Sequence, residues 1–421
     1  MGEGILAMHL LLVEDEGHRL LRPITFTRPV YELRTGFYTL RERISRVYEE
    51  EKIVLHSRSY LKDVVREYTD LPVNIVPSGD VLIVNGRAII PYGFSNKVKV
   101  DGPPATYVNR DGEIVVIRPD GKTLEKLAEK ISEGTVLNLS ELICGERIEV
   151  DVHMIKYLWD TYEVNEELLV EDFKQYEAGI YGHLSSGVVT LGDVYVAEGA
   201  EVDPGVILDG RHGPVFIDKN ARIMHNAVII GPTYIGEKCT IKVGAKIYEN
   251  TSLGKVCKVG GEVDAVIFQS YSNKQHEGFI GHAYIGEWVN IGADTNNSDL
   301  KNTYGTVKVY VDGEPMNTGK LFVGVMIGDH TKTGINTMFN TGTVVGVAVN
   351  VYGAGYPPKY IPSFLWGGAE GFVEHRFDKA VETARRMMAR RDVELTPAYE
   401  KMLRKIYEMT ASERQKLIES T

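Results

Sequence analysis

Hydrophobic residues recur at every sixth position through the middle of the chain. Between Thr233 and Val259 the series is unbroken, and it consists of Ile235, Ile241, Ile247, Leu253 and Val259. Small or hydroxyl-bearing residues occupy several of the steps between them. A period of six fits neither the 3.6 residues per turn of an α-helix nor the alternation of a long strand. It predicts a parallel β-helix, in which short strands and turns alternate and each coil stacks on the next.

The same period extends, with interruptions, over residues 180–368. Three hexads would complete one triangular coil, so the segment predicts several coils. From Val259 to Ile285 and from Asp294 to Tyr310 the period lapses into polar sequence, and we expect loops outside the coils there. A β-sandwich with evenly spaced strands is the alternative, but five consecutive residues at one fixed period disfavour it. The further members of the series are Val196, Val202, Leu208, Ile217, Ile223, Ile229, Ile285, Ile291, Ile327, Thr333, Phe339, Val345 and Val351.

Strand-like and helix-like segments alternate in residues 1–175. Buried strands are predicted at 9–13, 52–56 and 81–85, and helices at 39–51 and 59–68. This order is typical of an α/β domain with a mostly parallel sheet. Ligands of such sheets bind at the carboxyl ends of the strands, so the loops that follow the strands are the first places to look for a site.

The last segment, residues 369–421, has helical spacing throughout. Pro397 separates two predicted helices, and Thr396 is placed to cap the second. The simpler interpretation is a helical pair that covers the open end of the β-helix. The alternative is that a local basic group contacts a nucleotide or a neighbouring subunit; it consists of Arg385, Arg386, Arg390 and Arg391.

Composition narrows the function classes. Hydrophobic residues make up 43% and charged residues 25% of the chain, which is ordinary for a globular protein. The net charge of −11 leaves no basic excess for general nucleic-acid binding. Cys144, Cys239 and Cys257 have no metal-ligand spacing, which favours a reduced, cytoplasmic compartment. No apolar run is long enough to predict a membrane span.

The loop after the first predicted strand, VEDEGHRLLRPITFTRPVYELRTG, carries three arginines within ten residues. They are Arg19, Arg22 and Arg28. Arginine suits phosphate because its guanidinium group is planar, multidentate and always charged. A solvated loop whose arginines pair with the preceding acidic residues is the other interpretation.

The stretch EGHRLLRPITFTRP resembles the sugar-nucleotidyltransferase signature, a glycine-rich G-x-G-T-R followed by P-L-T and Lys-Pro. The resemblance aligns Gly17 and Arg19 with the nucleoside-triphosphate loop, and Arg28 with the lysine. It implies that Arg19 and Arg28 neutralise the triphosphate while a sugar 1-phosphate attacks the α-phosphorus, with Mg²⁺ assisting.

The predicted metal site departs from that family. The strand that normally ends in a metal-binding aspartate ends here in Asn85, followed by Arg87. Asparagine is a poorer ligand than a carboxylate for a hard cation. Asp15 and Asp80 remain as alternative sources of the charge.

The stretch KQHEGFIGHAYIGEWVNIGAD resembles the acetyltransferase domain of the bifunctional glucosamine-1-phosphate acetyltransferase/N-acetylglucosamine-1-phosphate uridylyltransferase family. The resemblance implies a left-handed β-helix in which His276 is the general base, a step for which imidazole is well matched. It places Asn290 at the substrate, Ala293 beside acetyl-CoA, and Lys242 where the family has a phosphate-binding arginine. Phe279 replaces a substrate tyrosine.

The loop that follows, with Asn296, Lys301 and Asn302, lies where the family binds the sugar phosphate. The resemblance further implies a homotrimer with sites between subunits. The leading hypothesis is acetyl transfer from acetyl-CoA to glucosamine 1-phosphate, then nucleotidyl transfer from a nucleoside triphosphate. A nucleotidyltransferase that uses the β-helix only as a scaffold and a non-catalytic sugar-nucleotide sensor are the alternatives.

Overall fold

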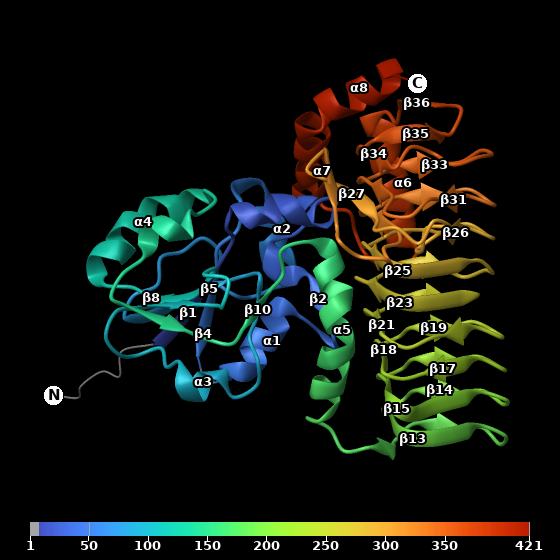
Figure 1. Ribbon diagram of the computed structural model, residues 1–421, viewed down its shortest axis with the longest axis horizontal. Helices are drawn as coiled ribbons and strands as arrows, with labels where there is room; N and C mark the ends of the chain where they lie inside the picture. The colour runs from blue at the N-terminus through green and yellow to red at the C-terminus, as the bar shows by residue number, and fades with distance from the viewer. Residues whose placement is uncertain (1–7, 50, 421) are drawn as a thin grey trace.

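The computed structural model describes residues 8–49 and 51–420 and has three parts. Figure 1 shows an α/β domain on the left, a β-helix of stacked coils on the right, and helices at the upper end of that stack. The β-helix is left-handed and has about 10 turns over residues 179–367. The hexad period predicted the β-helix and the strand–helix alternation predicted the α/β domain, while the left-handed winding was implied by the resemblance.

The N-terminal domain is built on a six-stranded sheet of order β4-β1-β5-β8-β7-β9. The first three strands pair in parallel, β5 pairs antiparallel with β8, and β8 pairs antiparallel with β7. The sheet is therefore mixed, and its parallel half consists of the three strands predicted from sequence. The strands are β1 (Met8–Val13), β4 (Lys52–Leu55), β5 (Asp80–Asn85), β7 (Ala105–Val108), β8 (Ile114–Arg118) and β9 (Glu146–Glu149).

Two helices of this domain, α1 and α4, begin at side-chain caps that the sequence encodes locally. The Thr39 side chain accepts from the Glu42 backbone N–H and the Glu42 carboxylate accepts from the Thr39 N–H, a capping box that starts α1. Asp120 caps α4 with a single hydrogen bond, which its side chain accepts from the Thr123 backbone N–H. The predicted helix at 59–68 is a 3₁₀ turn followed by α2. The helices are α1 (Leu40–Val47), α2 (Lys62–Tyr68), α3 (Phe94–Lys97), α4 (Gly121–Glu133) and α5 (Leu158–Phe173); the short strands are β2 (Arg34–Thr35), β3 (Tyr38–Thr39), β6 (Ala88–Ile89) and β10 (His153–Met154).

The β-helix has three faces of parallel strands. The first face packs on the N-terminal domain, the second contains β22 and β24, and the third contains β20 and β26. Long strands such as β23 and β25 turn a corner and belong to both the third and the first face. The strands are β11 (Gly179–Ile180), β12 (His183–Leu184), β13 (Val189–Val196), β14 (Glu201–Val202), β15 (Ile207–Ile217), β16 (Arg222–Ile223), β17 (Val228–Ile230), β18 (Thr233–Ile235), β19 (Thr240–Ile241), β20 (Lys246–Ile247), β21 (Thr251–Leu253), β22 (Lys258–Val259), β23 (Glu262–Phe268), β24 (Asn273–Lys274), β25 (Phe279–Ile285), β26 (Asn296–Asn297), β29 (Met326–Ile327), β30 (Lys332–Thr333), β31 (Met338–Phe339), β32 (Val344–Val345), β33 (Asn350–Val351), β34 (Tyr360–Ile361), β35 (Leu365–Gly368) and β36 (Gly371–Glu374).

The hexad residues line the interior of the coils. All five members of the unbroken series are at most 1% exposed, and the earlier and later hydrophobic members are at most 2% exposed. Corresponding members stack on one another, as Ile223, Ile241 and Val259 do on the second face. The prediction of inward positions is confirmed, because one inward residue per strand is what a triangular coil requires.

The prediction of a loop between Val259 and Ile285 is wrong, because the coils of the β-helix continue through this segment. β23, β24 and β25 carry the ladder, and Lys274, assigned to the loop, is a buried strand residue. The period changes because the turns there differ in length: Lys258 pairs with Asn273, fifteen residues later, instead of eighteen. The second expected loop is partly wrong, since β26 is a coil strand. A hairpin of β27 (Lys308–Val311) and β28 (Glu314–Asn317) projects after it.

Aromatic side chains attach the N-terminal domain to the first face. The Phe37 ring stacks on Tyr234 with centroids 4.7 Å apart and lies 4.7 Å from the Phe216 ring. Further along the face, Tyr284 and Met326 share one buried cluster with Leu21 and Leu33. Burial of these side chains on both sides makes the two domains one packed unit.

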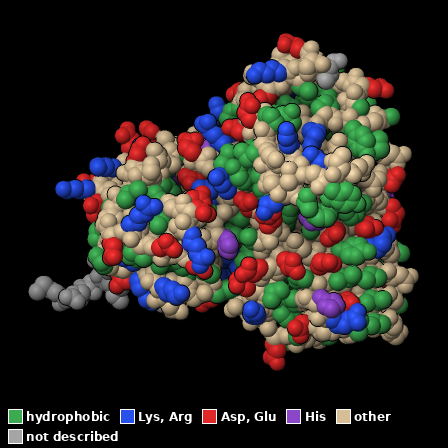
Figure 2. All heavy atoms as spheres, in the orientation of Figure 1, with side chains coloured by type: hydrophobic (Ala, Val, Ile, Leu, Met, Phe, Trp, Pro, Cys, Tyr) green, Lys and Arg blue, Asp and Glu red, His purple; other side chains and the backbone are tan. Residues whose placement is uncertain are grey.

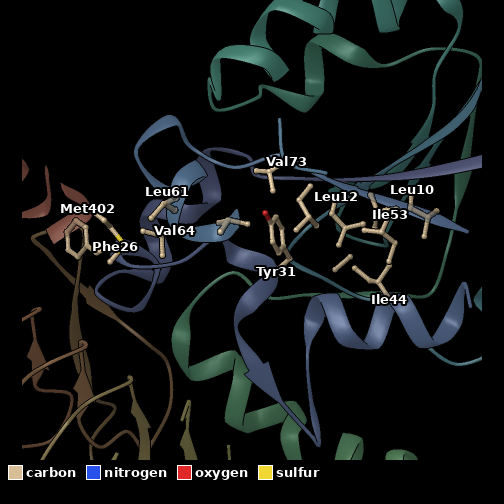
Figure 3. Packing of buried hydrophobic residues seen from close by; sticks show 14 of the residues in the cluster. Leu10, Leu12, Phe26, Tyr31, Ile44, Ile53, Leu61, Val64, Val73 and Met402 are labelled. Atoms are coloured by element: carbon tan, nitrogen blue, oxygen red, sulfur yellow. The ribbon is translucent and has the colours of Figure 1, made fainter. Parts of the chain in front are cut away.

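The C-terminal segment forms three helices instead of the predicted two. They are α6 (Phe377–Ala389), α7 (Pro397–Met409) and α8 (Ala411–Ser420), and the predicted Thr396 cap of α7 is confirmed. α8 covers the end of the β-helix, where Ile418 packs on its core. Met402 of α7 packs in one cluster with Phe26, Leu61 and Val64 of the N-terminal domain (Figure 3). The segment therefore caps the stack and also connects it to the first domain.

Within the described residues, no helix is both long and apolar enough to cross a membrane.

Candidate functional site

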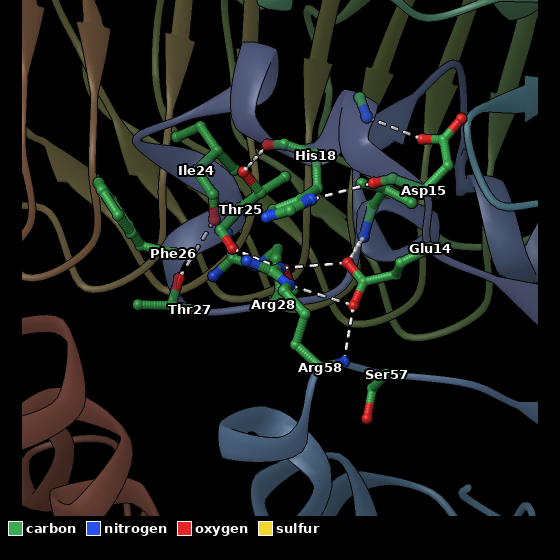
Figure 4. A network of polar contacts seen from close by, with 12 residues as sticks. Glu14, Asp15, His18, Ile24, Thr25, Phe26, Thr27, Arg28, Ser57 and Arg58 are labelled. Atoms are coloured by element: carbon green, nitrogen blue, oxygen red, sulfur yellow. Dashed lines mark hydrogen bonds and ion pairs between the residues drawn. The ribbon is translucent and has the colours of Figure 1, made fainter. Parts of the chain in front are cut away.

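The carboxyl edge of the parallel strands is filled by the protein's own charged side chains. Glu14 follows β1 and is fully buried. Its carboxylate accepts hydrogen bonds from the Val30 and Arg58 backbone N–H groups, each 3.0 Å away, and from the Arg58 guanidinium group (Figure 4). Arg58 also donates to the carbonyls of Thr25 and Arg28. This network fixes the arginine-rich loop against the strand ends.

Asp15 is neutralised beside it. Arg87 donates to both carboxylate oxygens, at 2.8 and 2.7 Å, and Asn85 donates at 3.0 Å. Burial alone would raise the pKa of Asp15, but Arg87 and the hydrogen bonds lower it below its ordinary value. Both oxygens are thus engaged.

The Mg²⁺ expected from the resemblance does not fit these residues. Asp15 would have to leave Arg87 to bind a cation. The prediction of Asp80 as an alternative metal ligand is wrong. Asp80 pairs with Met8 at the amino end of β5, which is the opposite edge of the sheet. Within residues 8–49 and 51–420, no three His, Cys, Asp or Glu side chains converge as a metal site.

The two arginines predicted to hold a triphosphate are separated. Arg19 is exposed and forms a surface ion pair with Glu16 at 3.3 Å. Arg28 is buried and donates to Asp329 of the β-helix at 2.5 Å, with Glu287 3.4 Å away. Burial works to lower the pKa of Arg28, but those two carboxylates outweigh it and raise the pKa above its ordinary value. Arg28 therefore connects the domains.

A cleft of about 1110 Å³ lies where the N-terminal domain, the β-helix and the C-terminal helices meet. Charged side chains gather along this junction (Figure 2). The lining contains ten carboxylates and five cations. Such an excess of negative charge disfavours a polyphosphate. The cleft is therefore a poor candidate for a nucleotide site.

His276 lies on the edge between the second and third faces. Its turn stacks on the turn of the next coil, since the Asp294 N–H donates to the Glu277 carbonyl at 2.8 Å. On the other side, a Cβ on Gly261 would come within 2.6 Å of the His276 carbonyl. A Cβ on Gly260 would likewise lie against the Gln275 carbonyl and the Lys242 side chain. Two of the predicted residues, Lys242 and Ala293, therefore lie along one edge with His276, Ala293 on the next coil and Lys242 two coils away on the other side.

The His276 ring is exposed, and no described side chain hydrogen-bonds it. Its backbone, by contrast, is fixed. The Lys274 Nζ donates to the carbonyls of His276 and Gly260, at 3.0 and 2.8 Å, and the Asn296 Oδ1 accepts from the Phe279 N–H at 2.7 Å. A free imidazole on a rigid edge is suited to proton transfer with a bound substrate.

Burial of Lys274 predicts a pH dependence of stability. Burial lowers the pKa of Lys274 to about 8, from an ordinary value of 10.5. Between these pH values the unfolded chain holds a proton that the folded chain has lost, so the free energy of unfolding rises with pH, by about 1 kcal/mol per unit. Lys274→Met removes this contribution. In urea titrations from pH 7 to 10.5, the wild type should gain stability relative to the variant, and parallel curves would contradict the prediction.

The other predicted substrate residues are more dispersed. Asn290 lies beside Asn273 on the second face, with its Oδ1 3.4 Å from the Asn273 Nδ2. Lys301 donates to the Thr306 carbonyl at 2.7 Å, and Asn302 is exposed. Both follow Asp299, which lies beside His282 in the middle of β25, at the corner between the third and first faces, so within one chain they do not join His276.

A histidine–aspartate pair escaped the sequence interpretation, which had placed His282 in a loop. The His282 Nδ1 lies 2.9 Å from the Asp299 Oδ2, and the His282 ring stacks on Phe322 with centroids 5.1 Å apart. The two residues are seventeen positions apart, close to one coil. Residues about one coil length apart in the sequence stack on one another, so a search for polar pairs at that spacing would have identified His282 and Asp299.

Comparison with known proteins gives two results. Residues 10–180 match the family described as sugar nucleotidyl transferase. The chain is 25% identical over 399 residues to the bifunctional protein GlmU of Methanococcus aeolicus, covering 80% of this chain and 91% of that protein. The chain is a divergent relative of the GlmU proteins.

Two other relatives match over shorter stretches. GlmU of Methanocaldococcus jannaschii is 30% identical over 188 residues, which cover 45% of this chain and 40% of that protein. A bifunctional sugar-1-phosphate nucleotidylyltransferase/acetyltransferase of Sulfurisphaera tokodaii is 28% identical over 142 residues, covering 33% and 35%. The chain thus spans well under two thirds of these two relatives.

Proposed function

We propose that the chain is a two-activity transferase. It transfers an acetyl group from acetyl-CoA to glucosamine 1-phosphate and a nucleotidyl group from a nucleoside triphosphate to the resulting sugar 1-phosphate, giving a nucleotide sugar of the UDP-N-acetylglucosamine type. The observation that carries the proposal is the unpaired His276 ring on an edge that also holds Lys242 and Ala293. The names of the GlmU relatives and the sugar nucleotidyl transferase match of residues 10–180 support it.

In acetyl transfer, His276 acts as the general base. The sugar amine attacks the thioester carbonyl, a C–N bond forms, and the C–S bond breaks as CoA leaves. The imidazole takes the proton that the amine loses. Lys242, about 10 Å from Gln275 across two coil spacings, binds the sugar phosphate, and the small side chain of Ala293 leaves room for the thioester. Asn290 and Asn296 contact the sugar, while Lys301 and Asn302 contact it from a neighbouring subunit.

The nucleotidyl half depends on the N-terminal domain. Arg19, with its exposed guanidinium group, is the residue that contacts the triphosphate. GlmU-type nucleotidyl transfer uses a divalent metal. Because Asp15 is paired with Arg87, we assign no step to a metal held by this chain.

The test is an assay of the purified protein that reads CoA and pyrophosphate separately. Acetyl-CoA is offered with glucosamine 1-phosphate, and UTP, dTTP or ATP with N-acetylglucosamine 1-phosphate or glucose 1-phosphate. Both CoA and pyrophosphate are expected. Pyrophosphate without CoA would leave the β-helix as a scaffold. If neither CoA nor pyrophosphate is released, a non-catalytic sensor is favoured.

We propose further that the protein is a cytoplasmic homotrimer. Exposed apolar side chains lie on the same edge as His276: Val243 is 56% exposed and Ile335 is 72% exposed. Burial of such side chains against a second copy stabilises association. The three cysteines are free, which is in keeping with a reducing compartment.

Ile335→Asp is expected to dissociate the trimer, because a carboxylate would be buried at the subunit contact. Light scattering at micromolar concentration measures the mass directly. Val189→Asp, at a residue that is 44% exposed on the first coils, is the control that should stay trimeric. A monomeric wild type, or a trimeric Ile335→Asp, would contradict the proposal.

A further inference from the structure

Four cations gather where the end of α6 meets the second face of the β-helix. We call Lys242, Lys258, Arg390 and Arg391 the basic cluster. Lys258 lies one position before Val259, whose carbonyl accepts from the Lys242 N–H at 2.8 Å. Arg391 reaches the same face, since its Nη2 donates to the Asn273 Oδ1 at 3.0 Å, and Asn273 is the ladder partner of Lys258.

The basic cluster has no carboxylate of its own. Among the described residues, none of the four side chains forms an ion pair, whereas Arg385 and Arg386 of the same helix pair with Glu400 and Glu382. The carboxyl end of α6 offsets part of the repulsion for the two arginines. Nothing comparable is available to Lys258 on the coil.

Two further observations favour an anion-binding site at the basic cluster. The Nε of Arg391 is buried and has no hydrogen-bond partner, which is costly for a charged donor. The pKa of Lys258 is lowered, first by burial and then by the positive charges of the other three members. A bound anion would satisfy the free donor and remove the repulsion.

We propose that the basic cluster binds a phosphate group, with Lys258, Arg390 and Arg391 supplying most of the contacts. Three to four cations around one site match the charge and the several acceptor oxygens of a phosphate. Lys242 lies at the side of the cluster toward the His276 edge. The C-terminal helices thereby contribute to ligand binding, beyond covering the end of the stack.

The position relates this phosphate to the transferase site. Asn273 precedes His276 by three residues, so their backbones lie at most about 11 Å apart. That span accommodates a hexose between a phosphate in the basic cluster and an amine at His276. The inference rests on the proposed function only in attributing the phosphate to a substrate. The source is either the sugar 1-phosphate or the phosphorylated nucleotide of acetyl-CoA.

Calorimetric titration of the full chain at low salt tests the proposal without turnover. The probes are inorganic pyrophosphate, glucose 1-phosphate and adenosine 3′,5′-bisphosphate. Lys258→Met and Arg391→Met are each expected to weaken binding of pyrophosphate about tenfold or more, because each removes a charged hydrogen bond. Arg385→Met and Arg386→Met, on the same helix but already paired, should leave binding unchanged. If Arg391→Met fails to fold, Arg390→Met, with its exposed side chain, takes its place.

The outcomes separate this inference from the proposed function. Loss of glucose 1-phosphate binding in the cluster variants identifies the sugar phosphate as the source, and loss of the bisphosphate identifies the nucleotide. Equal losses in Arg386→Met would mean nonspecific attraction and would overturn the site, as would a wild type that binds no probe. Either result would refute the phosphate site without refuting the proposed acetyl transfer, because CoA release in the presence of His276 is measured separately.

Discussion

His276→Ala is expected to lower the rate of CoA release with glucosamine 1-phosphate by about 10²- to 10⁴-fold. Removing the imidazole leaves the attacking amine without a general base, and positioned bases contribute accelerations of that size. The ring is exposed and unpaired among the described side chains, so the change should cost little stability. Pyrophosphate release should be unaffected, because the N-terminal domain packs on the first face of the β-helix, whereas His276 lies on the edge between the second and third faces.

His183→Ala is the matched control. His183 is an exposed histidine on the second face of the first coils, and its loss should leave both activities intact. Unchanged CoA release in His276→Ala would refute the assignment of the base.

Asp329→Ala is expected to lower the free energy of unfolding by about 3–5 kcal/mol. Its fully buried carboxylate accepts from the Thr27 hydroxyl at 2.8 Å, from Arg28 at 2.5 Å, and from the Glu287 N–H at 2.9 Å. Alanine would leave the Arg28 charge buried without its closest partner, with Glu287 3.4 Å away. Urea denaturation at neutral pH measures the loss.

The control for this variant is an exposed pair. Arg110 and Asp151 lie 3.6 Å apart with side chains 76% and 84% exposed, so Asp151→Ala should cost less than about 1 kcal/mol. Arg28→Met combined with Asp329→Leu should recover part of the stability, since both charges of the Arg28–Asp329 pair are removed together and neither is left buried without the other. An Asp329→Ala loss as small as that of Asp151→Ala would show that the domains do not depend on this contact.

Both predictions concern residues whose environments could not be inferred from nearby sequence. Arg28 was assigned to a triphosphate because the arginines of its loop suit phosphate. Its partner Asp329 is 301 positions away, on a coil that docks only when both domains have folded. The same holds for Asp15, whose carboxylate was a candidate metal ligand until Arg87, 72 positions away, paired with both of its oxygens.

The chain's own pattern determined the architecture. A strand of the β-helix needs one inward apolar residue and a turn, both of which are local, so the series from Ile235 to Val259 predicted the coils and their interior. The alternation of strands and helices predicted β1, β4 and β5 for the same reason. Only the tertiary structure decided which charges are free. Ion pairs form between residues that packing brings together, and sequence carries no local signal of that choice. The His276 ring is exposed and unpaired among the described residues, whereas Arg28 is paired at the domain junction. Arg391 lies near Lys258 on a face formed by segments more than a hundred residues apart.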